Sequence, residues 1–165
     1  MTKIKLSFTV ICCFLICIGF AQQDVNWDKE IPVDPKVRIG KLDNGLVYYI
    51  RKNSKPENRV ELRLAVKAGS MQETDEQVGL AHFTEHMAFN GSTHFKKNEL
   101  ISYMQSIGMR FGGDINAYTS FDETVYMLTV PTDNKGQLDT GFLVLLDWAA
   151  NLSMESKDID DERGV

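Results

Sequence analysis

Residues 79–92 read GLAHFTEHMAFNGS, and this stretch decides which fold and which chemistry to expect around it. In a helix, residues four apart differ by about 40° around the axis, so the imidazoles of His82 and His86 leave from nearly one face. Two neutral imidazoles at this spacing can bind one Zn²⁺. Glu85 flanks this pair, and its carboxylate can take a proton from metal-bound water. The stretch therefore predicts a helix that carries two zinc ligands and a catalytic base.

The flanking residues indicate where this helix begins and ends. Thr74 can cap the helix, and Gln77 three residues later completes a capping-box pattern. The apolar periodicity runs to about Phe89, and Asn90-Gly91 is a typical stop signal. We therefore predict one helix from about residue 75 to residue 89.

The remaining elements follow from periodicity and turn residues. Alternation predicts strands at about 37–42, 46–50, 60–66, 115–119 and 124–130, and apolar repeats predict helices at about 98–107, 135–151 and from Ser153 or Ser156 onward. For the helix over 135–151 we expect the buried stripe to be Leu138, Phe142, Leu145 and Ala149. This order predicts an α+β fold in which helices cover a mostly antiparallel sheet on one side.

The first 36 residues differ from the rest in composition. Lys3 and Lys5 precede an apolar run from Leu6 to Phe20, and small residues follow at the positions that a signal peptidase reads. We predict a signal peptide over 1–21, cleaved after Ala21, and a linker over 22–36. The alternative is a transmembrane anchor, but the run is shorter than the ~20 residues that span a bilayer. Export to a bacterial periplasm or secretion, with no stable membrane anchor after cleavage, is therefore expected.

Charge and cysteine content exclude other classes of protein. The formal net charge is −5 and no basic cluster is present, which argues against nucleic-acid binding. All three cysteines, Cys12, Cys13 and Cys17, lie inside the predicted signal peptide. A mature chain would therefore have no disulfide framework and no thiolate metal site, so any metal must be held by nitrogen and oxygen ligands.

His-x-x-Glu-His is the inverted zinc motif of the inverzincins. The stretch at 79–92 resembles the M16 (pitrilysin and insulin-degrading enzyme) peptidase family, and so do Gly69-Ser70, Asn116–Ser120 and Glu162–Val165. The residues of these blocks are most similar to the PqqL-like bacterial branch of the family. The resemblance covers about residues 35 to 165. It implies a zinc metalloendopeptidase domain of the M16-type α/β roll, of which residues 37–165 are the N-terminal part, incomplete at the C-terminal side.

The resemblance also implies a third zinc ligand, a glutamate on a later helix. By residue count, Glu162 could be this ligand. By motif alignment, Glu162 begins the family's segment, and the ligand would be a second glutamate seven residues later, at position 169, past Val165. We favour the second register, in which residues 111–114 are a small insertion and Glu162 is a supporting acid. The lone His94 is expected to lie in a loop and not to bind metal.

Substrate and partners are likewise implied by the resemblance. The strand that contains Asn116 and Ala117 is expected to be an edge onto which an extended peptide adds, with these two residues contacting the substrate backbone. A C-terminal homologous half of the full-length protein is the expected partner. Two alternatives to a peptidase stay open at this point, namely a non-catalytic M16-like partner or scaffold subunit and an exported peptide-binding module.

Overall fold

A computed structural model describes residues 28–164 of the chain. The chain divides into two compact units between Lys52 and Asn53. We call residues 28–52 the hairpin unit and residues 53–164 the main unit. The predicted signal peptide and residues 22–27 of the predicted linker lie outside the described residues. The predicted boundaries of 1–21, 22–36 and 37–165 therefore stay predictions.

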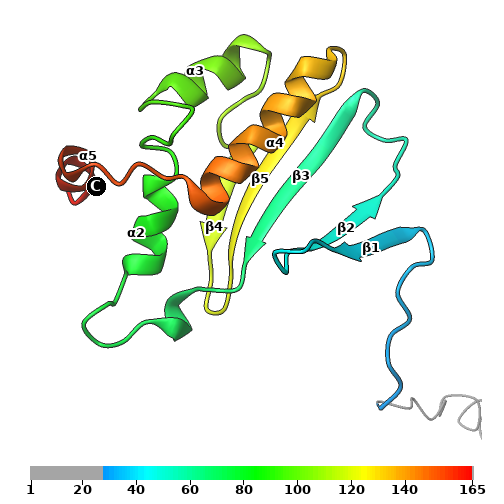
Figure 1. The fold of residues 1–165 in the computed structure, drawn as a ribbon, viewed down its shortest axis with the longest axis horizontal. Coiled ribbons are helices and arrows are strands. Elements are labelled where there is room, and N and C mark those ends of the chain that lie inside the picture. The colour runs from blue at the N-terminus through cyan, green and yellow to red at the C-terminus, as the bar shows by residue number, and fades with distance from the viewer. Residues whose placement is uncertain (1–27, 165) are drawn as a thin grey trace, which may run out of the picture. The chain divides into compact units, whose positions relative to one another are not determined.

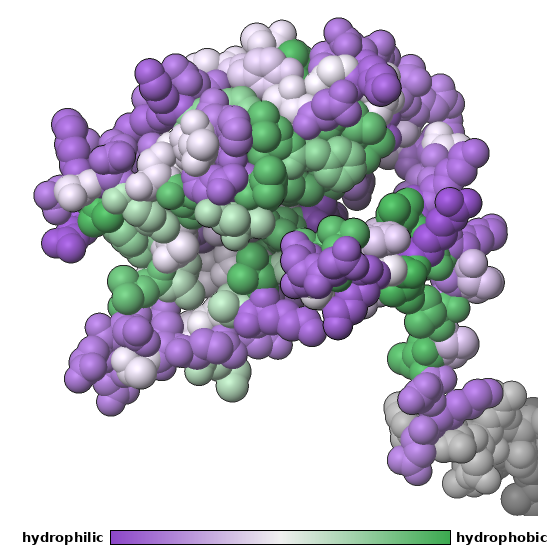
Figure 2. All heavy atoms as spheres, viewed as in Figure 1, coloured by the Kyte–Doolittle hydropathy of each residue, from purple (hydrophilic) through white to green (hydrophobic). Residues whose placement is uncertain are grey.

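The hairpin unit contains two antiparallel strands, as the sequence predicts. Strand β1 (Val37–Lys41) pairs with β2 (Val47–Arg51), with Ile39 opposite Tyr49. Gly45 adopts a positive φ of 93° in the turn, which is the conformation that favours glycine there. Several apolar side chains of this unit are exposed, and Figure 2 shows apolar residues at its surface; they include Ile31, Val33, Ile39, Val47, Tyr49 and Ile50.

The main unit is built on a three-stranded antiparallel sheet (Figure 1). Its strands are β3 (Arg59–Val66), β4 (Ile115–Thr119) and β5 (Thr124–Pro131), in the order β3-β5-β4. Strand β5 is central, and six of its eight residues are buried. Within residues 28–164, β5 is the only strand that pairs with β4, and the other edge of β4 carries just an isolated bridge from Phe111 to Ile115 at its first residue.

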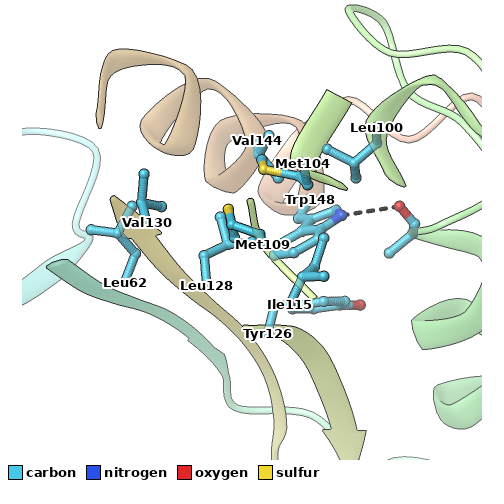
Figure 3. Packing of buried hydrophobic residues seen from close by; sticks show 11 residues of the cluster. Leu62, Leu100, Met104, Met109, Ile115, Tyr126, Leu128, Val130, Val144 and Trp148 are labelled. Atoms are coloured by element: carbon cyan, nitrogen blue, oxygen red, sulfur yellow. Dashed lines mark hydrogen bonds between the residues drawn. The ribbon is translucent and has the colours of Figure 1, made fainter. Parts of the chain in front are cut away.

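Helices cover one face of this sheet, which confirms the predicted α+β class. Helix α4 (Lys135–Ala150) packs on β3 and β5. Helix α2 (Leu80–Met87) packs beside β4, and α3 (Glu99–Ser106) and α5 (Ser156–Glu162) complete the unit. Figure 3 shows the core between the layers, which contains Leu62, Met104, Ile115, Leu128, Val130, Val144 and Trp148.

The prediction for the buried face of α4 is correct in part: Leu138 and Leu145 pack against the core, whereas Phe142 and Ala149 are exposed. The fully buried residues are Gly141, Val144, Asp147 and Trp148, whereas Phe142 is 55% exposed. A Cβ atom on Gly141 would lie 3.0 Å from side-chain atoms of both Leu62 and Val130, so this glycine lets the helix approach the sheet closely. The close approach rotates Val144 and Trp148 into the core and turns Phe142 outward.

The predicted start of the motif-bearing helix is also wrong. The N–H of Thr74 donates to the side-chain oxygen of Gln77, but the N–H of Gln77 donates to the backbone carbonyl of Thr74 and not to its hydroxyl, so the pair closes a turn and does not cap a helix. A short 3₁₀ helix, η1 (Ser70–Gln72), precedes this turn, and α2 begins only at Leu80. Gly79 has a φ of 92°, and this left-handed conformation separates the turn from the helix.

Among residues 28–164, no helix combines the length and the apolar character that crossing a bilayer requires.

Candidate functional site

Helix α2 presents both histidines of the motif on one side, as the spacing predicts. The Nε2 atoms of His82 and His86 lie 3.1 Å apart, and the two rings meet edge to face with their centroids at 4.5 Å. The side chain of His82 is 65% exposed and that of His86 is 36% exposed, so both can be reached from solvent. The two nitrogens therefore converge on one accessible point.

This convergence fits a tetrahedral zinc ion. Two nitrogens that bind the same zinc ion at about 2.0–2.1 Å lie about 3.3 Å apart when the geometry is tetrahedral. The observed separation of 3.1 Å is close to that value without any side-chain movement. Imidazole nitrogens are also among the preferred ligands of zinc. The donor type and the spacing of the two histidines both fit the metal.

Glu85 lies beside this point in a sheltered position. It is only 8% exposed, and its Oε2 atom lies 3.7 Å from Nε2 of His82. The hydroxyl of Thr119, at the end of β4, donates to the same oxygen at 3.3 Å. Burial raises the pKa of the neighbouring Tyr126 to about 12, and the charge of Glu85 adds to this effect, so the phenol stays neutral. Glu85 thus has one hydroxyl partner and faces the histidine pair.

Glu162, on α5, reaches the opposite side of His86. One carboxylate oxygen bonds Nδ1 of His86 at 2.8 Å, and the other accepts a hydrogen bond from the amide of Asn90 at 2.7 Å. The bond with His86 is the largest influence that holds the pKa of Glu162 below its ordinary value, against the effect of burial. Because Glu162 engages Nδ1, it fixes the ring that points Nε2 toward His82.

No third side chain joins the two Nε2 atoms within the part of the chain that the structure describes. Over residues 28–164, no group of three or more His, Cys, Asp or Glu side chains is arranged to hold a metal ion. A catalytic zinc usually has three protein ligands. Residues 28–164 therefore bring together two convergent imidazoles and a sheltered carboxylate, with Glu162 bonded to the far nitrogen of His86.

Strand β4 places Asn116 and Ala117 on the free edge of the sheet, next to the motif helix. The backbone N–H of Ala117 donates to its neighbour's side-chain oxygen, Oδ1 of Asn116, at 3.0 Å. This N–H therefore points away from the central strand β5. Thr119, two residues further on, contacts Glu85. The structure brings the predicted peptide-binding strand and the motif helix together.

A buried carboxylate holds the turn that follows α2. Asp147 is 1% exposed and accepts four hydrogen bonds: from the hydroxyl of Ser92 at 2.5 Å, the backbone N–H and Nδ1 of His94 at 3.0 and 2.8 Å, and the amide of Asn151 at 3.1 Å. The neighbouring Trp148 donates to the carbonyl of Ala88 at 3.0 Å (Figure 3). His94 lies in this turn, away from the histidine pair.

Sequence reasoning missed Thr119, Asn90 and Asp147 as contributors around this site. The sequence pattern indicates Asn90 only as a helix stop, although its amide also bonds Glu162. Thr119 is separated from Glu85 by 34 residues, and Asp147 is separated from Ser92 and His94 by 53–55 residues. No local spacing signal links residues so far apart in the chain.

A protein-family model described as "Insulinase (Peptidase family M16)" matches residues 48–165. The chain is 41% identical over its whole length to a protein of Haemophilus influenzae named "Probable zinc protease PqqL", and 44% identical over 82% of its length to the protein of that name in Escherichia coli. It spans only 18% and 14% of those two proteins, respectively.

Solved structures agree with this similarity. The crystal structure of the first half of the periplasmic protease PqqL from Escherichia coli superimposes with a TM-score of 0.78 at 43% identity. The match covers 82% of this chain and 29% of that one. The α+β arrangement of the main unit is therefore that of a known group of protease domains.

Proposed function

This chain belongs to the M16 (insulinase) peptidase family, in its PqqL-like group, and from this premise we propose that it carries the metal-binding half-site of a zinc-dependent endopeptidase. The observation that carries the proposal is the convergence of two Nε2 atoms, 3.1 Å apart, beside the sheltered carboxylate of Glu85. His82 and His86 would hold the zinc ion. Bound zinc supplies Lewis acidity, which polarises a scissile carbonyl and makes water a better nucleophile.

Glu85 is proposed as the general base and acid. Its carboxylate takes a proton from the attacking water and returns it to the leaving amine of the cleaved peptide bond. The position of Glu85 supports this role because it lies next to the histidine pair without sharing their point of convergence. The hydroxyl of Thr119 donates to Oε2, the oxygen that lies 3.7 Å from Nε2 of His82, and so holds the carboxylate in place beside the histidine pair.

Glu162 is proposed as a support for His86 and not as the third ligand. A ligating histidine usually engages its second ring nitrogen with a carboxylate or carbonyl, and this contact fixes the tautomer and orientation of the ring. The 2.8 Å contact between Glu162 and Nδ1 of His86 is of this type. The third ligand then comes from the following part of the full-length protein, in the register that places a glutamate seven residues after Glu162.

The free edge of β4 is the proposed binding site for the substrate. An extended peptide that pairs with this edge would bind through main-chain hydrogen bonds, which tolerate many sequences. The N–H of Ala117 points away from β5 and is satisfied by the flexible side chain of Asn116, so a peptide carbonyl can take its place. The contact between Thr119 and Glu85 then sets the bound peptide beside the base.

An Ala117→Pro substitution in the full-length protein tests this binding mode. Proline removes only the outward N–H and is tolerated on edge strands when the missing donor faces solvent. We expect KM for peptide substrates to rise about tenfold, the loss of one hydrogen bond of about 1.4 kcal/mol. The matched control is Ala117→Gly, which keeps the N–H and should bind peptides like the parent protein. An unchanged KM for Ala117→Pro would argue against edge pairing at this residue.

Zinc binding tests the metal site directly. In full-length protein, His82→Ala should weaken zinc binding by more than about 100-fold, because it removes a ligand and not merely a supporting contact. Zinc content and chelator competition measure this. Glu162→Gln should weaken zinc binding by about 10–100-fold.

The control for this experiment is the remaining histidine. His94→Asn keeps a nitrogen donor toward Asp147 and should retain the zinc of the parent protein. Parent protein that binds no zinc would contradict the metal site and would favour a non-catalytic subunit or a peptide-binding module. Equal zinc loss from His82→Ala and His94→Asn would contradict the assignment of ligands.

The location and partner of the site are proposed on the same basis. The relative in Escherichia coli is described as a periplasmic protease, and this chain covers a small share of such proteins. We place the full-length protein outside the cytoplasm, with a second, homologous half closing over the site. Detection of the protein only in the cytoplasmic fraction of cells would contradict this placement.

A further inference from the structure

The helix that carries both histidines has no cap of its own. Its N-cap residue, Gly79, offers no side chain, and the left-handed backbone at this residue marks an abrupt start. The first backbone N–H groups of a helix have no partner within the helix. The first turn of α2 therefore depends on an acceptor from elsewhere in the chain.

Glu73 provides this acceptor from six residues upstream. Its two carboxylate oxygens accept hydrogen bonds from the backbone N–H groups of Gly79 at 2.9 Å and Ala81 at 2.7 Å. The bond from Ala81, followed by that from Gly79, lowers the pKa of Glu73 below its ordinary value. A carboxylate at this end of a helix is also favoured by the helix dipole. Ala81 directly precedes His82.

The segment that carries Glu73 is itself fixed to the sheet. The backbone N–H groups of Ser70 and Met71 donate to the carbonyls of Ser120 and Phe121 at 3.1 and 2.7 Å. A Cβ atom on Gly69 would lie 2.3 Å from the carbonyl oxygen of Ser120, so the close approach requires glycine. Residues 69–73 therefore form a strap from the turn after β4 to the start of α2.

We infer that Glu73 is a positioning residue for His82, which rests on the zinc site proposed above. His82 lies in the first turn of α2 and His86 in the second. Loss of the acceptor at Glu73 frays the first turn and so displaces His82, while His86 keeps its contact with Glu162. The strap thereby sets the position of His82 relative to His86. It also sets the position of His82 relative to β4, the strand proposed to bind the peptide.

Variants of Glu73 in the full-length protein test this inference. We expect Glu73→Ala to weaken zinc binding about tenfold, measured by chelator competition, which corresponds to about 1.4 kcal/mol. Glu73→Gln keeps one acceptor oxygen and should lie between Glu73→Ala and the parent protein. The control is Glu76→Gln, an exposed carboxylate of the same loop, which should leave zinc affinity unchanged.

Hydrogen exchange in the zinc-free protein gives a reading that does not depend on the metal. Peptides that cover residues 79–82 should exchange faster in Glu73→Ala than in Glu76→Gln, whereas those over β5 should exchange equally. Zinc affinities of both Glu73 variants within twofold of Glu76→Gln would overturn the inference, even with faster exchange. Parent protein without zinc affinity would instead contradict the proposed metal site. If Glu73→Ala does not fold, Glu73→Gln decides the question.

Discussion

Full-length protein with Glu85→Gln should hydrolyse peptides with a kcat about 10³-fold below that of the parent protein, while it still binds zinc. Glutamine has nearly the shape of glutamate but cannot take a proton from water at neutral pH, and general-base catalysis typically contributes 10²–10⁴-fold. The side chain is 8% exposed and bonded to Thr119, so the isosteric amide can occupy the same place. Steady-state kinetics with a fluorogenic peptide and metal analysis of the same sample measure both quantities.

In Glu85→Gln, kcat should fall while the zinc content of the protein stays the same. Because Glu85 stands beside the two Nε2 atoms and is not itself a ligand in the proposed site, its loss should leave KM and zinc content nearly unchanged. Glu76→Gln serves as the matched control and should keep full activity, since that side chain lies in an exposed loop. A Glu85→Gln protein that cleaves peptides at the parent rate would contradict the assignment of the base. A variant that loses its zinc would make Glu85 a ligand instead.

The residues of the motif could be predicted from the sequence because their relation is local. His82 and His86 are joined by one helical turn, so helix geometry alone brings their nitrogens to one side. The antiparallel strands and the α+β class were likewise predictable from alternation and from the order of elements. Both predictions are confirmed by the fold.

The start of α2 could not be predicted because two acceptable caps compete for it. Thr74 and Gln77 satisfy a capping-box pattern, but Gly79 breaks the helical path after this turn. Glu73 then satisfies the helix from outside, through a loop whose closure depends on the turn after β4. A sequence pattern indicates the capping box of Thr74 and Gln77. It cannot indicate the cap that Glu73 provides, because that cap depends on the tertiary structure.

The prediction for the buried side of α4 is wrong at Phe142 and Ala149 for a related reason. Between Leu138 and Ala150 the helix is apolar on nearly every side, so periodicity does not select one face. The contact of Gly141 with the sheet selects it instead, and this contact carries Asp147 into the interior. A charged residue is almost never fully buried unless it is paired. Two of the partners of Asp147, Ser92 and His94, come from the turn after α2, which no local pattern indicates.

Substitution of Asp147 should therefore destabilise the main unit strongly. We expect Asp147→Ala to lower the free energy of opening of residues 141–153 by about 3 kcal/mol, the cost of leaving buried partners unsatisfied. Ser92 and the backbone N–H of His94 would lose their acceptor. Native-state hydrogen exchange of the full-length protein measures this quantity segment by segment. The control is Asp139→Asn on the exposed side of the same helix, which should change it by less than about 0.5 kcal/mol.

The same carboxylate should make this region sensitive to acid. Burial by itself would raise the pKa of Asp147, but hydrogen bonds from Ser92, His94 and Asn151 hold it below its ordinary value. The unfolded chain then binds the proton first, at a pKa of about 3.9, so the stabilisation is complete above that pH and is lost as the pH falls through the lower, folded pKa. Asp147→Asn cannot titrate, so the difference in opening free energy between it and the parent protein should shrink as the pH falls from about 6 to about 3. A difference that stays constant over this range would show that the hydrogen bonds act through geometry alone, and that the charge of Asp147 contributes nothing to holding the turn after α2.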